Sequence, residues 1–134
     1  NGNMTRFLMT LEDAVDLVLY AFENGKGSET YIMKAKSVDI LTLAKKIISM
    51  YGSKNKIEIV GERKGEKTYE VLISEEEMNI SVDHGKYIVV DWKNRNVNKY
   101  KLPPYTSNNC ERFTDYELRN IIINGGKKSS SYRI

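Results

Sequence analysis

The sequence predicts one mixed domain of the α/β class, or α+β by a stricter definition, over residues 1–126. Apolar residues recur at helical spacing in three stretches, which predicts three main helices. Short β-prone runs bounded by turn residues predict a small sheet with one hairpin. The 134 residues correspond to a single domain, and 40% apolar residues can supply its core. The polar, basic tail over residues 127–134 is predicted to be disordered.

The first helix follows a short extended run at residues 6–9. Thr10 is predicted to cap it by accepting from the amide of Asp13. Apolar residues between Leu11 and Phe22 form one stripe, which such a pattern places in the core. Gly25 is expected to end the helix in the left-handed conformation.

A strand over residues 30–33 and a second strand over residues 57–60 flank the second helix. Asp39 is expected to cap this helix, whose apolar stripe reaches Tyr51 before Gly52 stops it. Strand, helix and strand with short links favour a small α/β unit.

After a charged loop, residues 68–72 are predicted to form a helical turn. Ser74 and Glu77 have the capping-box spacing of a further short helix. Its three glutamates indicate an exposed first turn. No metal site is expected, because neither histidine nor a converging carboxylate set accompanies them.

Two runs, residues 80–82 and 86–90, are joined by Asp83-His84-Gly85 and predict the hairpin. His84, a lone histidine at a turn, is expected to be exposed. Trp92 is expected in the core, with a stacking platform as the alternative. Residues 93–109 are predicted to be a loop, and Thr114 to cap a last helix over residues 115–124.

The charged loop is the strongest candidate for a binding site. Arg63 follows the predicted strand, and a guanidinium suits a phosphate bidentately. The carboxylate of Glu66 can accept from a sugar diol, and Gly65 lets the loop turn back. A phosphate-and-hydroxyl ligand such as a nucleotide fits this pattern. A solvated charged loop remains the alternative.

Three segments carry a family resemblance: GERKGEKTYEVLISEEE (61–77), TRFLMTLEDAVDLVLYAFENG (5–25), and the stretch from Tyr105 to Phe113 with the helix after it. They resemble the UDP-sugar 4,6-dehydratases and epimerases of polysaccharide synthesis, which are extended short-chain dehydrogenases. The third segment is similar to the carboxyl-terminal extension of the capsular UDP-N-acetylglucosamine 4,6-dehydratase/5-epimerase branch.

The resemblance implies a carboxyl-terminal, substrate-binding part that begins where the Rossmann domain has ended. The sequence holds neither GxGxxG nor YxxxK, the family's cofactor and catalytic motifs. We therefore expect no catalytic residue and no cofactor in this chain, with NAD(P) bound by the absent domain. The resemblance also places Arg6 on the nucleotide diphosphate, since it matches the family's R-x-x-x-x-x-E-D pattern. A surface arginine paired with Glu12 or Asp13 is the alternative.

Composition limits the partners. A net charge of +3 does not by itself argue for nucleic acid, and no apolar run approaches the ~20 residues of a membrane span. No secretory signal is visible. The single cysteine, Cys110, excludes an internal disulfide and is compatible with the cytoplasmic location that we expect. The expected partners are a UDP-sugar and the missing Rossmann domain, and a homo-oligomer is left open. A stand-alone nucleotide-binding module and an interaction domain without a small ligand are the competing classes.

Overall fold

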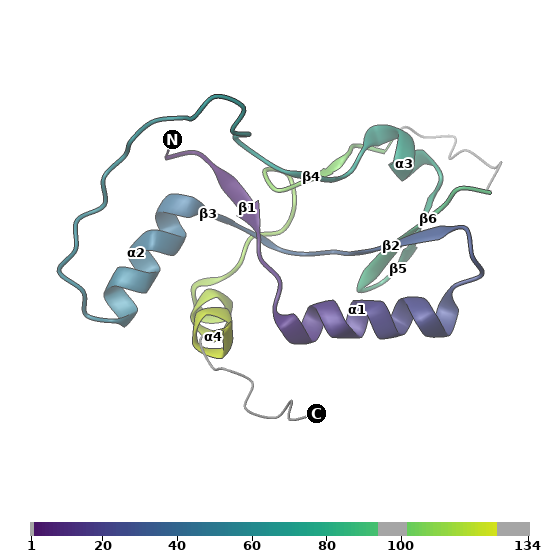
Figure 1. The fold of residues 1–134 in the computed structure, drawn as a ribbon, viewed down its shortest axis with the longest axis horizontal. Coiled ribbons are helices and arrows are strands. Elements are labelled where there is room, and N and C mark those ends of the chain that lie inside the picture. The colour runs from purple at the N-terminus through teal and green to yellow at the C-terminus, as the bar shows by residue number, and fades with distance from the viewer. Residues whose placement is uncertain (1, 94–101, 126–134) are drawn as a thin grey trace.

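In the computed structural model, residues 2–93 and 102–125 are described, and within them helices and strands are mixed as predicted (Figure 1). The helices are α1 (Leu11–Asn24), α2 (Ile40–Met50), α3 (Glu75–Asn79) and α4 (Asp115–Gly125). The strands are β1 (Thr5–Phe7), β2 (Glu29–Met33), β3 (Ser37–Asp39), β4 (Val71–Ile73), β5 (Ser81–His84), β6 (Tyr87–Asp91) and β7 (Tyr105–Thr106). The three longer helices, the short helix and the β5–β6 hairpin were all predicted from the sequence. The predicted disordered tail lies outside the described residues.

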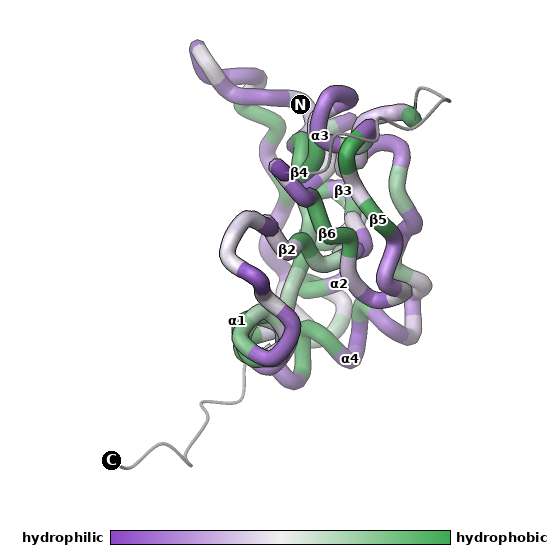
Figure 2. Tube along the Cα trace, turned by 90° about the vertical axis from the view of Figure 1, so that its right-hand side faces the viewer, coloured by the Kyte–Doolittle hydropathy of each residue, from purple (hydrophilic) through white to green (hydrophobic). Residues whose placement is uncertain are grey.

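The central sheet has the strand order β2-β6-β5, with both pairs antiparallel. The β5–β6 hairpin turns at Gly85, whose φ of 79° a residue with a side chain would adopt only under strain. Strand β6 lies in the middle of the sheet and is apolar along most of its length (Figure 2). A strand that is buried on both faces needs such a continuous apolar run.

The two faces of the sheet bury separate clusters because side chains alternate along a strand. Tyr87 packs with Met33 and Ala35, and α1 covers this cluster with Leu17 and Tyr20. Ile88 and Val90 point to the other face and pack against residues of β4, α3 and β7 (Ile73, Met78 and Tyr105). Figure 1 shows α1 and α3 on opposite sides of the sheet.

Two further sheets are short antiparallel pairs, β1–β3 and β4–β7. Two strand predictions need correction. Residues 57–60 form no strand, since none of the described segments pairs with them. Residues 71–73 form a strand where a helical turn was expected, because Tyr105 and Thr106 pair with them from more than 30 positions away. Long-range pairing here overrides the local signal.

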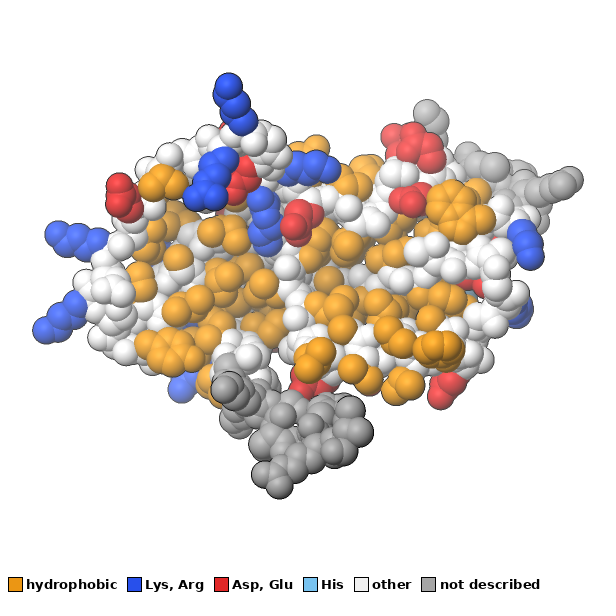
Figure 3. Space-filling view, in the orientation of Figure 1, with side chains coloured by type: hydrophobic (Ala, Val, Ile, Leu, Met, Phe, Trp, Pro, Cys, Tyr) orange, Lys and Arg blue, Asp and Glu red, His pale blue; other side chains and the backbone are white. Residues whose placement is uncertain are grey.

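Helix α1 begins as predicted, with a capping box in which the Thr10 hydroxyl accepts from the amide of Asp13. Its apolar stripe, however, faces outward, which corrects the expected core. Phe22 is 83% exposed, and four further large side chains are also exposed: Leu11, Val15, Val18 and Leu19. Figure 3 shows apolar side chains gathered on this side of the molecule.

The end of α1 and the position of Trp92 differ from the predictions, whereas the start of α4 agrees with them. Gly25 has a φ of −71°, so it does not end α1 in the left-handed conformation. A glycine is nevertheless needed at position 25, because an added Cβ would lie 2.6 Å from the Ala21 carbonyl oxygen. Trp92 is 57% exposed and is not a core residue, and its indole donates to Thr30 Oγ1. Thr114 caps α4 as predicted.

No helix in the described part of the chain is both long enough and apolar enough to cross a membrane.

Candidate functional site

A cavity of about 370 Å³ lies between α2 and the long connection from α2 to β4. One wall is apolar and comes from the first turns of α2, and the facing wall is the extended segment of residues 57–61. Arg63, Glu66 and Glu58 supply the charged groups of the lining. The volume falls in the range of small-ligand sites, and a mostly apolar cavity with a few polar groups is their usual composition.

The Arg63 loop (residues 61–68) is folded back on itself by a tight turn. Gly65 has a φ of 83°, and the amide of Glu66 donates to the carbonyl of Arg63 at 3.0 Å. The Glu66 carboxylate in turn accepts from the amide of Arg63 at 3.1 Å. The structure therefore brings two of the predicted site residues together at one cavity.

Arg6, the third predicted site residue, is not among the residues that line this cavity. From β1 its guanidinium reaches the end of the same loop, where it donates to the carbonyl oxygens of Lys67 at 2.8 Å and Thr68 at 3.4 Å. It also donates to the carbonyl of Thr5 at 2.7 Å. Its Nε lies 3.6 Å from Glu70 rather than beside Glu12 or Asp13. Arg6 thus contacts the loop that carries Arg63.

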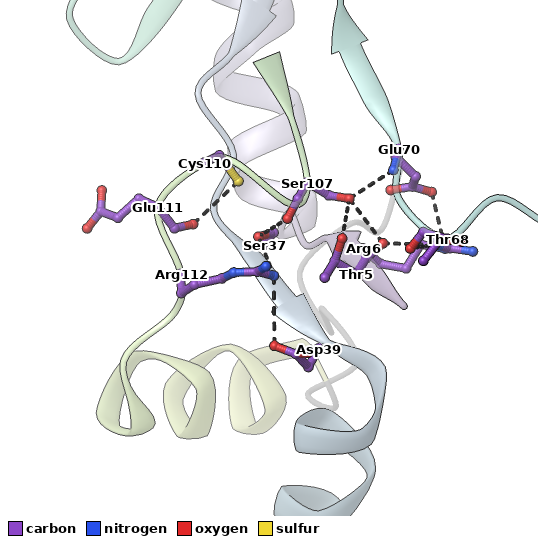
Figure 4. A network of polar contacts seen from close by, with 10 residues as sticks. All are labelled: Thr5, Arg6, Ser37, Asp39, Thr68, Glu70, Ser107, Cys110, Glu111 and Arg112. Carbon is purple, nitrogen blue, oxygen red and sulfur yellow. Dashed lines mark hydrogen bonds and ion pairs between the residues drawn. The ribbon is translucent and has the colours of Figure 1, made fainter. Parts of the chain in front are cut away.

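Glu70 and Ser107 connect this loop to β1 (Figure 4). The amide of Glu70 donates to Ser107 Oγ at 2.8 Å, and the amide of Ser107 donates to the carbonyl of Glu70 at 2.9 Å. Ser107 Oγ also lies 2.7 Å from Thr5 Oγ1 and donates to the carbonyl of Thr5 at 3.1 Å. Ser107 is fully buried. The segment at Ser107 thus fixes both β1 and the segment at Glu70.

A second buried serine extends the network toward α2. Ser37 Oγ donates to the carbonyl of Ser107 at 2.7 Å and accepts from Arg112 at 3.1 Å. Arg112 also lies 3.9 Å from Asp39, the residue that precedes α2 (Figure 4). The helix that forms one wall of the cavity is therefore tied to the same network as the Arg63 loop.

Lys36 forms ion pairs with two glutamates of the segment from Glu111 to Glu117. Its Nζ lies 2.6 Å from Glu111 and 2.7 Å from Glu117. The ion pair with Lys36, together with the hydrogen bonds from Thr114, lowers the pKa of the Glu117 carboxyl to about 2. Lys36 therefore links the segment before β3 to the stretch that leads into α4 through two ion pairs.

A second cavity, of about 590 Å³, lies where α1 begins, between α2 and α4. Its lining is mostly apolar and includes Leu11, Leu43, Ile47, Ile121 and Ile122. It adjoins the exposed face of α1, since Leu11 belongs to both. It holds no cluster of polar groups comparable to Arg63 and Glu66.

No group of three or more histidine, cysteine, aspartate or glutamate side chains that could hold a metal ion occurs among residues 2–93 and 102–125. The cavity can offer an apolar surface, the guanidinium of Arg63 and the carboxylates of Glu66 and Glu58. Sequence reasoning predicted Arg63 and Glu66 as site residues, but it missed the contact of Glu70 with Arg6 and the hydrogen bonds that Ser107 makes with Thr5 and Glu70. Nothing in the sequence could have indicated the contact between Ser107 and Thr5, since the two residues lie 102 positions apart.

Comparisons with known proteins agree with the resemblance at the family level. Residues 1–92 match the family described as "Polysaccharide biosynthesis protein". The chain is 40% identical over 132 residues to a protein named UDP-glucose 4-epimerase from Rickettsia akari (strain Hartford), covering 90% of this chain and 39% of that protein. It is 41% identical over 133 residues to the protein of the same name from Rickettsia bellii (strain OSU 85-389), covering 91% and 39%.

Among solved structures, the chain resembles the X-ray structure of Pen from Bacillus thuringiensis with a TM-score of 0.78 and 31% identity. The match covers 94% of this chain and 39% of that one. The chain therefore spans about two fifths (39%) of the length of these relatives.

Proposed function

We propose that this chain, which belongs to the polysaccharide biosynthesis protein family, forms the nucleotide-sugar-binding part of an enzyme that acts on a UDP-sugar. The observation that carries the proposal is the cavity beside α2, where Arg63 and Glu66 meet an apolar wall. A diphosphate needs a cation, and a nucleoside presents a diol and an apolar ring face. The cavity offers a group for each of them.

In this proposal Arg63 binds the diphosphate, because a guanidinium forms charge-assisted, bidentate hydrogen bonds with phosphate oxygens. Glu66 accepts from the ribose hydroxyls and orients the nucleoside. The apolar residues of α2 and of the 57–61 segment exclude water around both groups. Arg6 remains a predicted ligand of the diphosphate, although in this structure its guanidinium binds loop carbonyls.

The residues of this chain do not fit a nicotinamide dinucleotide, because the sequence holds neither a glycine-rich GxGxxG turn nor a YxxxK pair. We assign no hydride-transfer step to it. We propose that NAD(P) binds to a part of the longer protein outside these residues. The exposed face of α1, with Phe22 at 83% exposure, is the surface that we propose packs against that part.

We further propose UDP-N-acetylglucosamine as the substrate and 4,6-dehydratase or epimerase chemistry as the activity of the whole protein. The resemblance of the Arg63 loop and of the segment from Tyr105 supports the dehydratase side. The name UDP-glucose 4-epimerase, carried by the Rickettsia relatives, supports the epimerase side. Both activities require a pocket for uridine diphosphate, which is the function assigned to this chain.

The binding test titrates the isotopically labelled chain with uridine diphosphate and follows its amide NMR signals. We expect shifts in residues 61–66 and in the first turns of α2. Arg63→Ala should weaken binding roughly ten- to a hundredfold, the effect of losing one or two charge-assisted hydrogen bonds. Lys64→Ala is the matched control, since it removes a neighbouring cation that does not line the cavity. Equal losses in the two variants, or shifts confined to other surfaces, would refute the proposal.

A catalytic test separates binding from chemistry. The 134-residue chain, supplied with UDP-N-acetylglucosamine and NAD(P), should give no turnover. A 4-keto-6-deoxy product formed by the pure chain would contradict the assignment. In a longer protein that contains this sequence, Arg63→Ala should raise KM more than it lowers kcat, because the diphosphate is bound similarly in the ground and transition states.

A further inference from the structure

The Glu70 carboxylate bridges two groups of β1. One oxygen, Oε1, lies 3.6 Å from Nε of Arg6, and the other, Oε2, accepts from the amide of Phe7 at 3.2 Å. The side chain of Glu70 is 44% exposed and that of Arg6 is 23% exposed. The carboxylate therefore orients the guanidinium at the edge of the molecule rather than in the core.

The backbone of Glu70 is fixed from the opposite side. Ser107 accepts from its amide and donates to its carbonyl, and Ser107 is itself fully buried. The main chain of Glu70 is thus held by two hydrogen bonds with Ser107, while its side chain contacts β1 (Figure 4).

Arg6 links Glu70 to the Arg63 loop. With its Nε directed at Glu70, its two terminal nitrogens donate to the carbonyls of Lys67 and Thr68, at the end of the loop. Arg63 and Glu66 lie only a few residues earlier in the same loop, and the remainder of the connection to α2 forms no helix or strand. The contacts of Arg6 are therefore a side-chain restraint from outside the loop, placed at the residue that follows Glu66.

We propose that Glu70 is a positioning residue for this nucleotide site: by orienting Arg6, it holds the Arg63 loop in the geometry that binds the diphosphate. The inference rests on the proposed function, because it assumes that Arg63 contacts the nucleotide. Glu70 itself does not line the cavity and contacts no ligand in this proposal. The opposite role, in which Glu70 only withholds Arg6 from the diphosphate, predicts tighter binding by Glu70→Gln.

The test is Glu70→Gln in the 134-residue chain, with uridine diphosphate as the probe and calorimetry or NMR as the readout. Glutamine keeps the size and can still accept from the Phe7 amide, so the variant removes mainly the charge that orients Arg6. We expect affinity to fall about two- to fivefold, the range for a partly exposed ion pair.

Asp83→Asn provides a matched control. Asp83 has the same double function at the hairpin, since one oxygen accepts from the amide of Gly85 while the other pairs with Lys34. It lies outside the cavity lining, so its loss should leave the affinity for uridine diphosphate unchanged. Thermal unfolding of both variants shows whether any loss of affinity exceeds what an equal loss of stability produces.

A double-mutant cycle tests whether Glu70 acts through Arg6. In an Arg6→Ala background, Glu70→Gln should change affinity by less than about twofold, since the residue through which it acts is gone. Additive effects would overturn the proposal, as would unchanged or tighter binding by Glu70→Gln alone. If Arg63→Ala still weakens binding in those cases, the proposed function stands and only the positioning role fails. If Arg63→Ala has no effect, both fail.

Discussion

Replacing Ser107 with alanine tests whether the buried network of hydroxyl groups stabilises the fold. Its Oγ accepts from the amide of Glu70 at 2.8 Å, lies 2.7 Å from Thr5 Oγ1, and donates to the carbonyl of Thr5. Alanine leaves the Glu70 amide and the Thr5 hydroxyl without this partner. A buried polar group that loses its partner costs about 1–3 kcal/mol. Two groups, one of them only partly buried, give a loss of about 2–4 kcal/mol.

A loss of this size is a large part of the 5–15 kcal/mol that typically separates the folded and unfolded states. At this chain length it corresponds to about 4 °C per kcal/mol, so Tm should fall by about 8–16 °C. The assay is chemical denaturation followed by circular dichroism, with a thermal scan beside it. Ser81→Ala is the control, since its hydroxyl is partly buried and donates to one carbonyl, that of Met78. It should cost no more than about 1.5 kcal/mol.

A second variant identifies the cause of the loss. Thr5→Val in the Ser107→Ala background removes the stranded hydroxyl and should recover part of the stability, because replacing both partners by apolar groups costs less than replacing one. The reasoning is refuted if Ser107→Ala loses less than about 1 kcal/mol, or no more than Ser81→Ala.

Three further predictions concern other parts of the fold. Glu117 has a pKa lowered from 4.5 to about 2, so its stabilising effect is present above pH 4.5 and is lost as the pH falls toward 2. Glu117→Gln should flatten the dependence of unfolding free energy on pH in that window, and an unchanged slope would count against the ion pair. Phe22→Ser should change stability by less than about 0.5 kcal/mol, because the ring is 83% exposed, and should reduce any self-association seen by ultracentrifugation. Gly25→Ala places a Cβ 2.6 Å from the Ala21 carbonyl and should cost about 1–3 kcal/mol. Gly125→Ala, with open space around it, should be neutral or stabilising in the same denaturation assay.

The sequence alone determined the features that depend on neighbouring residues. The Thr10 cap of α1 and the capping box of α3 formed as predicted, because a side chain and an amide three positions apart meet whatever surrounds them. The hairpin between β5 and β6 formed because its turn residues and its two β-prone runs are adjacent. The turn that brings Arg63 and Glu66 together is local in the same sense, since Gly65 lies between them.

The apolar stripe of α1 is a pattern that fits either a buried helix face or an exposed one. Helical periodicity predicted a face that avoids water, but it does not state what covers that face. The exposed stripe of α1 lies on the side turned away from the sheet, while Leu17 and Tyr20 cover the Met33 cluster. Only the three-dimensional arrangement revealed that this apolar stripe is on the surface.

Tertiary structure alone decided the contacts that join distant segments. Val71–Ile73 became a strand because Tyr105 and Thr106 came to lie beside it, against the local signal. Arg6 reached the end of the Arg63 loop because Ser107, which lies 102 positions from Thr5 and 37 from Glu70, holds β1 and Glu70 together. The energy of such contacts depends on distance in space, whereas a sequence pattern records only distance along the chain. The sequence therefore named the residues of the candidate site, and the fold decided which of them contact one another.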